Sequence, residues 1–241
     1  MVVAFVTGGN AGIGEAVVRQ LAKVPDFHVI VGSRNAESGS KLAESLTKEG
    51  HSVSSVQIDL YSDESILKAV EHINKTHGKL DVLVNNAGIL IDATPEAFTS
   101  TRDLFRKTFE TNVFGTAVLT EAALPLLRKS DYPRVVFVSS QMGSLESTLD
   151  ENTPFYNLDN KAYDGSKAAV NILAVNYARI LKDVGGASNA VCPGLVKTKL
   201  TAFSDYGAPT EVGAERIVEL ATAAPGGPTG TFSNRLGPLA W

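Results

Sequence analysis

The run Thr7-Gly8-Gly9-Asn10-Ala11-Gly12-Ile13-Gly14 decides the fold of this chain. It follows the apolar segment 2–6, which predicts a buried strand, and it leads into residues 15–22, where apolar residues recur at helical spacing. Glycines allow a tight turn and a close approach of the backbone to a pyrophosphate, and the first N–H groups of a helix attract anions. The segment therefore predicts a dinucleotide site, although glycine-rich turns also end strands for structural reasons alone.

Length and charge narrow the class of protein. A chain of 241 residues fits one large α/β domain, and no linker or repeat divides it, so we predict a single domain over residues 1–241. Charged residues make up 20% of the chain and the formal net charge is −4. Nucleic acids and anionic membranes call for clustered positive charge, so we expect neither as a partner.

The termini and the cysteine content indicate a cytoplasmic protein. No apolar run approaches the length of a transmembrane helix, and the N-terminus lacks the basic flank of a signal peptide. Cys192 is the only cysteine, so no internal disulfide can form and a reducing setting is expected. The four histidines do not show the spacing of metal ligands, and we predict no metal site.

Apolar strands alternate with helices along the whole chain. Strands are predicted at 2–6, 27–31, 53–58, 80–84, 134–138, 188–192 and 230–233, and helices at 15–22, 37–49, 62–77, 104–127, 162–184 and 211–223. This pattern predicts a Rossmann-type, doubly wound α/β fold, with a parallel sheet of about seven strands and helices on both faces. Ligands of such sheets bind at the carboxyl ends of the strands, where the turns at 7–14, 85–88 and 139–144 fall.

A tyrosine and a lysine form the first chemical motif. Tyr163 and Lys167 are four residues apart near the start of a predicted helix, so they share one face. A nearby ammonium stabilises a phenolate, so we expect Lys167 to lower the pKa of Tyr163 toward working pH, which suits a general acid or base. Ser139 and Ser140 end a strand at the same edge of the sheet, where a hydroxyl can bond a substrate carbonyl. An exposed helix turn also produces such a pair, so the motif alone is weak evidence.

Taken together, the motifs resemble those of the short-chain dehydrogenase/reductase family, over essentially the whole chain. The matching segments are Thr7-Gly8 with Gly12 and Gly14, Asp59-Leu60, Asn85-Asn86-Ala87-Gly88, Asn112, Ser140, Tyr163 with Lys167, and Pro193-Gly194 with Thr198. The resemblance implies that Tyr163 is the catalytic acid and that Lys167 binds the nicotinamide ribose and lowers the pKa of Tyr163. It implies that Ser140, usually the second serine of the pair, orients the carbonyl, and that Asn112 holds a water for proton relay.

The same resemblance implies a set of cofactor-binding residues. Asp59 would bond the adenine amino group, with Leu60 alongside, although Asp59 also suits a helix cap. Asn85 and Gly88 would line the adenosine ribose and support the sheet, whereas Pro193-Gly194 would lie against the nicotinamide. Cys192 is interpreted as a small buried hydrophobe. The full cofactor-binding set is Thr7, Gly8, Asn10, Gly12, Ile13, Gly14, Ser33, Arg34, Asp59, Leu60, Asn85, Ala87, Gly88, Tyr163, Lys167, Pro193, Gly194, Val196 and Thr198.

The end of the second predicted strand indicates which nicotinamide cofactor is used. A carboxylate there would bond the ribose 2′-hydroxyl of NAD, but the turn reads Gly32-Ser33-Arg34-Asn35 and holds no acid. Arg34 can pair with a 2′-phosphate, a bond worth about 1.5–3 kcal/mol, so we predict NADP(H). The alternative is that Arg34 stacks on adenine or lies in solvent. Several NADPH-dependent members carry a basic residue where this chain has Ala11, which points to a moderate preference.

These observations favour NADPH-dependent reduction of a ketone or aldehyde to an alcohol. The alternatives are an NADP- or NAD-dependent secondary alcohol dehydrogenase and, in another class, a non-catalytic dinucleotide sensor. Segments 145–160 and 195–209 and the tail 232–241 carry apolar and aromatic residues, which favours a bulky or aromatic small-molecule carbonyl substrate. The segment between Ser140 and Tyr163 is longer than in ordinary members, as in monomeric carbonyl reductases, and it leaves monomer, dimer and tetramer open.

Overall fold

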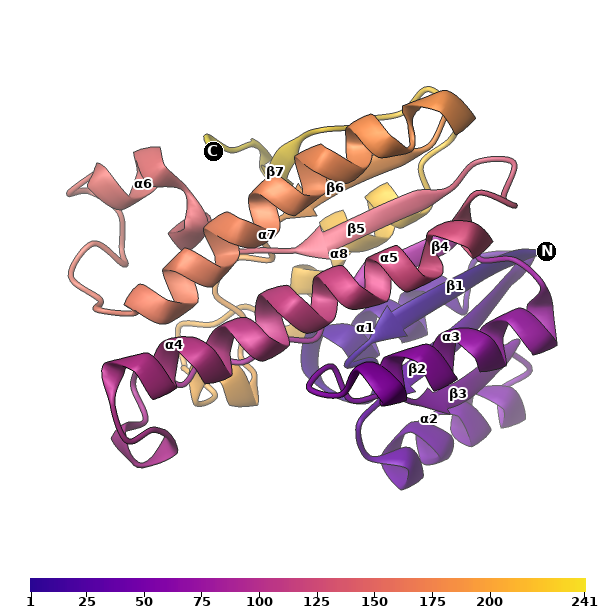
Figure 1. Cartoon of the computed structure of the whole chain (residues 1–241), viewed down its shortest axis with the longest axis horizontal. Helices are drawn as coiled ribbons and strands as arrows, with labels where there is room; N and C mark the ends of the chain where they lie inside the picture. The colour runs from indigo at the N-terminus through magenta and orange to yellow at the C-terminus, as the bar shows by residue number, and fades with distance from the viewer.

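The computed structural model describes residues 1–241 and contains one eight-stranded sheet (Figure 1). Its strand order is β3-β2-β1-β4-β5-β6-β7-β8, and every neighbouring pair is parallel except β7 and β8. The strands are β1 (Val2–Thr7), β2 (Phe27–Ser33), β3 (Val53–Gln57), β4 (Val82–Asn85), β5 (Arg134–Val138), β6 (Ala187–Val191), β7 (Phe232–Asn234) and β8 (Gly237–Pro238). The predicted fold class is confirmed, and the additional strand β8 is the short return of a hairpin from β7.

Helices cover both faces of this sheet. They are α1 (Gly12–Leu21), α2 (Ala36–Lys48), α3 (Asp63–His77), α4 (Thr101–Phe109), α5 (Thr116–Leu127), α6 (Leu145–Leu149), α7 (Lys161–Ile180) and α8 (Thr210–Ala221). Residues of α3, α5 and α7 form one buried cluster with alternate residues of β1, among them Phe5, whereas α1, α2 and α8 form a second cluster with Val6. Because both faces of β1 are buried, its sequence is a continuous apolar run. No helix combines the length and the apolar character of a membrane-spanning segment.

The topology gathers the predicted motifs at one edge. The strand order reverses beside β1, where β4 follows on one side and β2 on the other. Thr7 ends β1 and its Oγ1 accepts hydrogen bonds from the backbone N–H groups of Asn86 and Ala87, both at 3.0 Å. The glycine-rich turn and the turn after β4 therefore lie side by side, at the switch point where α/β sheets bind ligands.

The prediction of one long helix over residues 104–127 is wrong in one respect. The structure has two α-helices, α4 and α5, separated by a π-helical segment, Glu110–Gly115. A Cβ on Gly115 would lie 2.0 Å from the Leu60 carbonyl oxygen. The π-helical segment therefore lies so close to the backbone after β3 that only glycine fits at this position. Single π-helical turns recur at functional sites, and this one holds Asn112.

Candidate active site

Tyr163 and Lys167 lie one turn apart in α7, next to the end of β5. Both are buried, with 8% and 5% of their surfaces exposed. Lys167 Nζ donates a hydrogen bond to the Val138 carbonyl oxygen at 2.8 Å, and it lies 5.5 Å from the centre of the Tyr163 ring. The end of a parallel strand therefore fixes the ammonium beside the phenol, which is the pairing that the sequence predicts.

The two serines after β5 have different roles. Ser139 is buried and its Oγ donates to the Lys167 carbonyl oxygen at 3.2 Å, so it joins the strand end to α7. Ser140 is half-buried, its Oγ accepts from the Met142 N–H at 3.2 Å, and its hydroxyl is close enough to the Tyr163 phenol to lower the pKa of that phenol. The geometry thus leaves Ser140, rather than Ser139, beside the Tyr163 hydroxyl.

Asn112 lies in the π-helical segment and is almost completely buried, at 1% exposure. Its Oδ1 accepts from the Ile89 N–H at 2.8 Å, and its Nδ2 donates to the Ile89 carbonyl oxygen at 2.9 Å and to Ser166 Oγ at 3.0 Å. Gly88 lies between Asn112 and Lys167, since a Cβ there would be 3.3 Å from Asn112 Oδ1 and 3.5 Å from Lys167 Nζ. Asn112 therefore fastens the loop after β4 to α7 close to the ammonium.

Burial dominates the proton affinities of this cluster. It raises the pKa of Tyr163 above its ordinary value, Cys192 acts in the same direction, and the hydrogen bond with Ser140 opposes them. Burial also lowers the pKa of Lys167 to about 8. The expected lowering of the Tyr163 pKa is therefore wrong for this structure, because burial of the phenol is the largest influence and raises that pKa. The phenol stays protonated at neutral pH.

A pair of carboxyl groups lies at the start of α7, next to Tyr163. Asp92, from the loop after β4, accepts from the Ala162 N–H through Oδ1 at 2.8 Å. Its Oδ2 and the Oδ1 of Asp164 are buried without partners. Burial, followed by the charge of Asp92, raises the pKa of Asp164 to about 7. Two neighbouring carboxyl groups of this kind cannot both ionise freely.

The glycine-rich turn suits a pyrophosphate. Helix α1 begins at Gly12 with no side-chain cap from Ala11, so its first N–H groups are left for a ligand. A Cβ on Gly14 would lie 2.2 Å from the Gly8 carbonyl oxygen, so only glycine allows this tight a turn. Asn86 Nδ2 donates to the Thr7 carbonyl oxygen at 2.8 Å and holds the turn from the neighbouring strand end. This uncapped helix start and tight turn fit the diphosphate of a nicotinamide dinucleotide.

The turn after β2 lies next to the glycine-rich turn. Asn10 Nδ2 donates to Ser38 Oγ at 3.0 Å, and Ser33 Oγ donates to the Asn35 carbonyl oxygen at 2.7 Å. Arg34 is exposed between them and takes part in none of the ion pairs of the chain. A free guanidinium therefore lies at the sheet edge, beside the glycine-rich turn.

Three other predicted cofactor residues make internal bonds. Asp59 Oδ1 accepts from the Tyr61 N–H at 3.0 Å, which is a local turn bond, and the cap of α3 is Ser62 rather than Asp59. Asn85 is buried and its Nδ2 donates to Thr120 Oγ1 at 3.0 Å, joining β4 to α5, while its Oδ1 has no partner. With Thr7 bonded to the turn after β4, these three side chains support the backbone around the site.

The loop after β6 closes the other side of the site. Val196 is buried, and a Cβ on Gly12 would lie 3.3 Å from Thr198 Cγ2, so this loop meets the glycine-rich turn. Pro193 and Gly194 start the loop, and the Gly194 N–H donates to the thiol of Cys192 at 3.4 Å. Burial raises the pKa of that thiol, which agrees with its interpretation as a buried residue.

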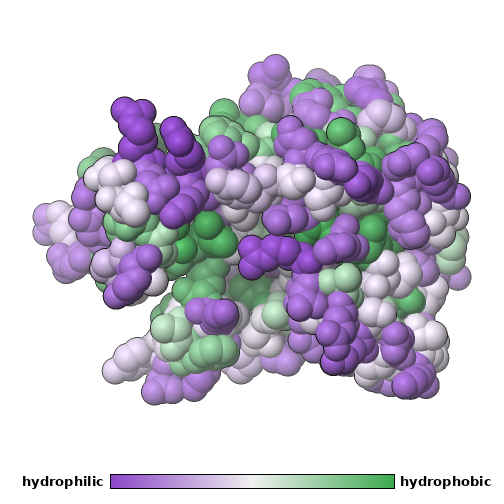
Figure 2. All heavy atoms as spheres, turned by 60° about the horizontal axis from the view of Figure 1, so that its bottom comes forward, coloured by the Kyte–Doolittle hydropathy of each residue, from purple (hydrophilic) through white to green (hydrophobic).

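Apolar side chains surround a hollow at this edge of the molecule. Figure 2 shows the hollow on the side toward which the parallel strands run, lined mostly by apolar residues. Segment 195–209, in the loop after β6, carries the exposed apolar side chains Leu195, Leu200 and Phe203. Ala202 and Phe203 both have positive φ, 48° and 55°, which is costly for side chains other than glycine and is characteristic of ligand-contacting loops.

Sequence reasoning missed three residues that shape the site: Ser38, Asn86 and Asp92. Asn86 was part of a recognised motif, and its position next to Asn85 was the available signal. Ser38 and Asp92 carry no local signal, because their partners Asn10 and Ala162 are distant in sequence.

Comparison with known proteins identifies the family. The family model described as "short chain dehydrogenase" matches residues 2–207. The chain is 33% identical to (+)-neomenthol dehydrogenase of Arabidopsis thaliana over 90% of each chain. The structure of salutaridine reductase from Papaver somniferum superposes with a TM-score of 0.80 at 28% identity, over 98% of this chain and all of that chain.

A second similar structure is the active-site complex of RhlG with NADP from Pseudomonas aeruginosa. It has a TM-score of 0.80 and 25% identity, and the match covers 97% of this chain and 94% of that chain. Family model, sequence relatives and fold agree over nearly the full length, and this chain belongs to the short-chain dehydrogenase family of oxidoreductases, whose members act on alcohol and carbonyl groups.

Proposed function

We propose that this protein reduces a ketone or aldehyde to an alcohol with NADPH. One observation carries the proposal: Ser140, the protonated phenol of Tyr163 and the ammonium of Lys167 converge at the carboxyl edge of the sheet. Reduction of a carbonyl requires a proton donor for the developing alkoxide, and a phenol whose pKa is raised by burial is a donor at neutral pH.

Each residue of the site has a defined task. NADPH, when bound, supplies the hydride for the carbonyl carbon. Ser140 donates a hydrogen bond to the carbonyl oxygen, and Tyr163 donates its proton to that oxygen as negative charge develops there. Lys167 holds positive charge next to the phenolate that remains. Asn112 joins the loop after β4 to α7, and a proton reaches Tyr163 and Lys167 between these two segments.

The turn after β2 supports NADPH over NADH. Arg34 is exposed and free of ion pairs, and no carboxylate stands at the end of β2 to repel a 2′-phosphate. The bond between Asn10 and Ser38 places two polar side chains next to it. Because Ala11 supplies no cation, we infer a preference for NADPH that rests mainly on Arg34.

The apolar hollow supports a bulky or aromatic carbonyl substrate, and the loop after β6 adds exposed apolar side chains such as Leu195 and Phe203. We infer that residues 1–241 act as one catalytic domain in the cytoplasm, where the buried thiol of Cys192 stays reduced.

A panel of ketones and aldehydes with NADPH oxidation as readout tests the proposal. Tyr163→Phe should bind NADPH as the wild type does and lose most turnover. Tyr132→Phe is the matched control, because that hydroxyl is buried without a partner and Tyr132 precedes β5 at the opposite edge of the sheet. Turnover retained by Tyr163→Phe would refute the mechanism, and a panel without any reaction would refute the activity.

Oxidation of a secondary alcohol is the second candidate, favoured by the similarity to neomenthol dehydrogenase. That direction needs Tyr163 as a base, and its raised pKa disfavours the phenolate at neutral pH. The ratio of forward to reverse rates at pH 7 distinguishes the two.

A further inference from the structure

A tail that is distant in sequence completes the start of helix α6. The N–H groups of Leu145 and Glu146 donate to the backbone oxygen of Trp241 at 3.1 and 3.4 Å. The first N–H groups of a helix lack partners within it, and the side chain of Ser144 satisfies only one of them, the Ser147 N–H at 3.1 Å. Trp241 therefore supplies the remaining acceptor for this five-residue helix.

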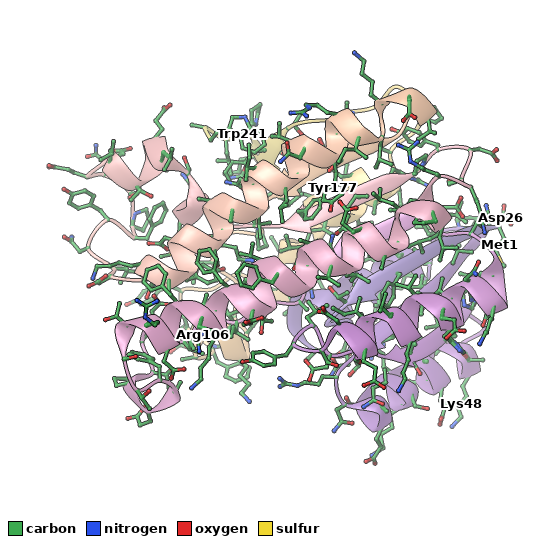
Figure 3. All side chains as sticks on the ribbon, in the orientation of Figure 1. Met1, Asp26, Lys48, Arg106, Tyr177 and Trp241 are labelled. Atoms are coloured by element: carbon green, nitrogen blue, oxygen red, sulfur yellow. The ribbon has the colours of Figure 1, made fainter.

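The position of Trp241 is set by the core of the sheet. Its ring stacks on Phe232 with centroids 5.5 Å apart, and Phe232 belongs to β7 and is 2% exposed. The Leu239 N–H donates to the Phe232 carbonyl oxygen at 2.9 Å, which closes the β7–β8 hairpin beneath the stack. Figure 3 labels Trp241 on the side of the molecule that carries α6. The tail is thus rigid up to the oxygen that α6 uses.

Helix α6 is directly connected to the catalytic serine. Ser140 begins the short 3₁₀ turn Gln141–Gly143, and Gln141 Nε2 reaches forward to Ser147 Oγ at 3.3 Å. The five residues from Ser140 to Leu145 span at most about 17 Å even when fully extended. Leu145 and Leu149, one turn apart, are 75% and 81% exposed. Leu145 is thus at most about 17 Å from Ser140, and the apolar face that it forms with Leu149 has no protein partner.

We propose that Trp241 is a positioning residue for substrate specificity: by anchoring α6, it holds Leu145 and Leu149 as one wall of the site for bulky apolar carbonyl compounds. The inference rests on the proposed function, since it assigns a wall to the same site. A small carbonyl compound does not reach this wall, so only large substrates depend on the anchor.

The first experiment measures hydrogen exchange of the segment 141–150. Trp241→Ala loses the stack on Phe232, and its α6 amides should exchange about tenfold faster than in the wild type. Trp241→Phe keeps an aromatic ring for the stack and should restore protection. Leu236→Ala is the matched control, because this exposed residue lies in the turn of the same hairpin and has no bond to α6. If Trp241→Ala does not fold, Trp241→Leu replaces it with the same expectation.

The second experiment measures kinetics with NADPH on propiophenone and on acetone. Trp241→Ala should raise KM for propiophenone about fivefold, with kcat and the Kd for NADPH within about twofold of the wild type and acetone unaffected. Trp241→Phe should restore KM.

Unchanged exchange in Trp241→Ala overturns the anchor. Faster exchange with unchanged KM for propiophenone overturns the role in specificity, as does an equal rise in KM for acetone. If the wild type reduces no carbonyl compound, the proposed function and the specificity role both fail, while the exchange measurement still decides whether Trp241 anchors α6.

Discussion

The ammonium of Lys167 is held by the carbonyl oxygen of Val138, the last residue of β5, at 2.8 Å. The bond places a buried positive charge at the end of a strand, 5.5 Å from the centre of the Tyr163 ring. A backbone carbonyl compensates only part of the cost of burial, so the pKa of Lys167 falls to about 8, close to working pH.

This pKa predicts the pH dependence of reduction. The ammonium is present below pH 8 and is lost as pH rises, whereas Tyr163, whose pKa is raised, keeps its proton over the same range. kcat/KM for an uncharged ketone should therefore be level below neutrality and fall as pH rises through about 8. Lys167→Arg keeps its charge at any such pH, so its residual activity should lack this limb. If kcat/KM of Lys167→Arg still falls as pH rises through about 8, a group other than Lys167 causes the fall.

Arg34 predicts the cofactor preference. Arg34→Asp should lower kcat/KM with NADPH by about tenfold to a hundredfold, the equivalent of a lost charge-assisted hydrogen bond, and should favour NADH. Arg235→Asp makes the same charge change at another exposed arginine and should leave the ratio unchanged. Equal kcat/KM with the two cofactors in the wild type would contradict the prediction.

Replacement of Asn112 should lower both the stability and the turnover of the protein. Asn112→Ala leaves the half-buried N–H and carbonyl of Ile89 without their partner, at a cost of up to about 1–3 kcal/mol for each unsatisfied group. Asn171→Ala is a suitable comparison, because Asn171 is similarly buried but makes one hydrogen bond, to the Gly143 carbonyl oxygen. The free energy of unfolding in urea should be lower for Asn112→Ala than for Asn171→Ala. The reverse order would show that Asn112 does not fasten the loop.

The carboxyl pair at the start of α7 predicts a stability effect that depends on pH. The pKa of Asp164 is raised to about 7, so the folded state binds its proton more tightly than the unfolded state, and this group costs stability as pH rises toward and above 7. Asp164→Asn should therefore raise Tm relative to the wild type at pH 8 and have a smaller effect at pH 5. Asp92→Asn keeps an oxygen for the Ala162 N–H and should act similarly. Equal shifts at both pH values would argue against the raised pKa of Asp164 as the cause.

Alanine substitutions at two helical glycines should change the stability in opposite directions. Gly115→Ala places a Cβ against the Leu60 backbone and should lower the free energy of unfolding by about 1–3 kcal/mol. Gly165→Ala, in α7, meets only the Phe109 ring at 3.6 Å and should raise it by about 0.5–1 kcal/mol. Chemical denaturation of both variants measures the difference. A neutral Gly115→Ala would show that the two backbones can separate.

Local patterns were sufficient for the order of the seven parallel strands and for most of their bounds, but not for α6 and β8. The helix predicted to end at Gly78 does so, because that glycine adopts the left-handed conformation at φ 73° that ends helices. The π-helical segment has no local signal, and the backbone that its Gly115 approaches, at Leu60, is 55 positions away in the chain.

The sequence by itself determined the fold and the family, because buried strands, glycine turns and motif order are local properties that a chain displays before it folds. Only the tertiary structure decided which of Ser139 and Ser140 meets the phenol, that burial raises the pKa of Tyr163, and that Trp241 completes α6. These outcomes depend on desolvation and on hydrogen bonds between segments far apart in the chain, and both arise only when the sheet brings those segments together.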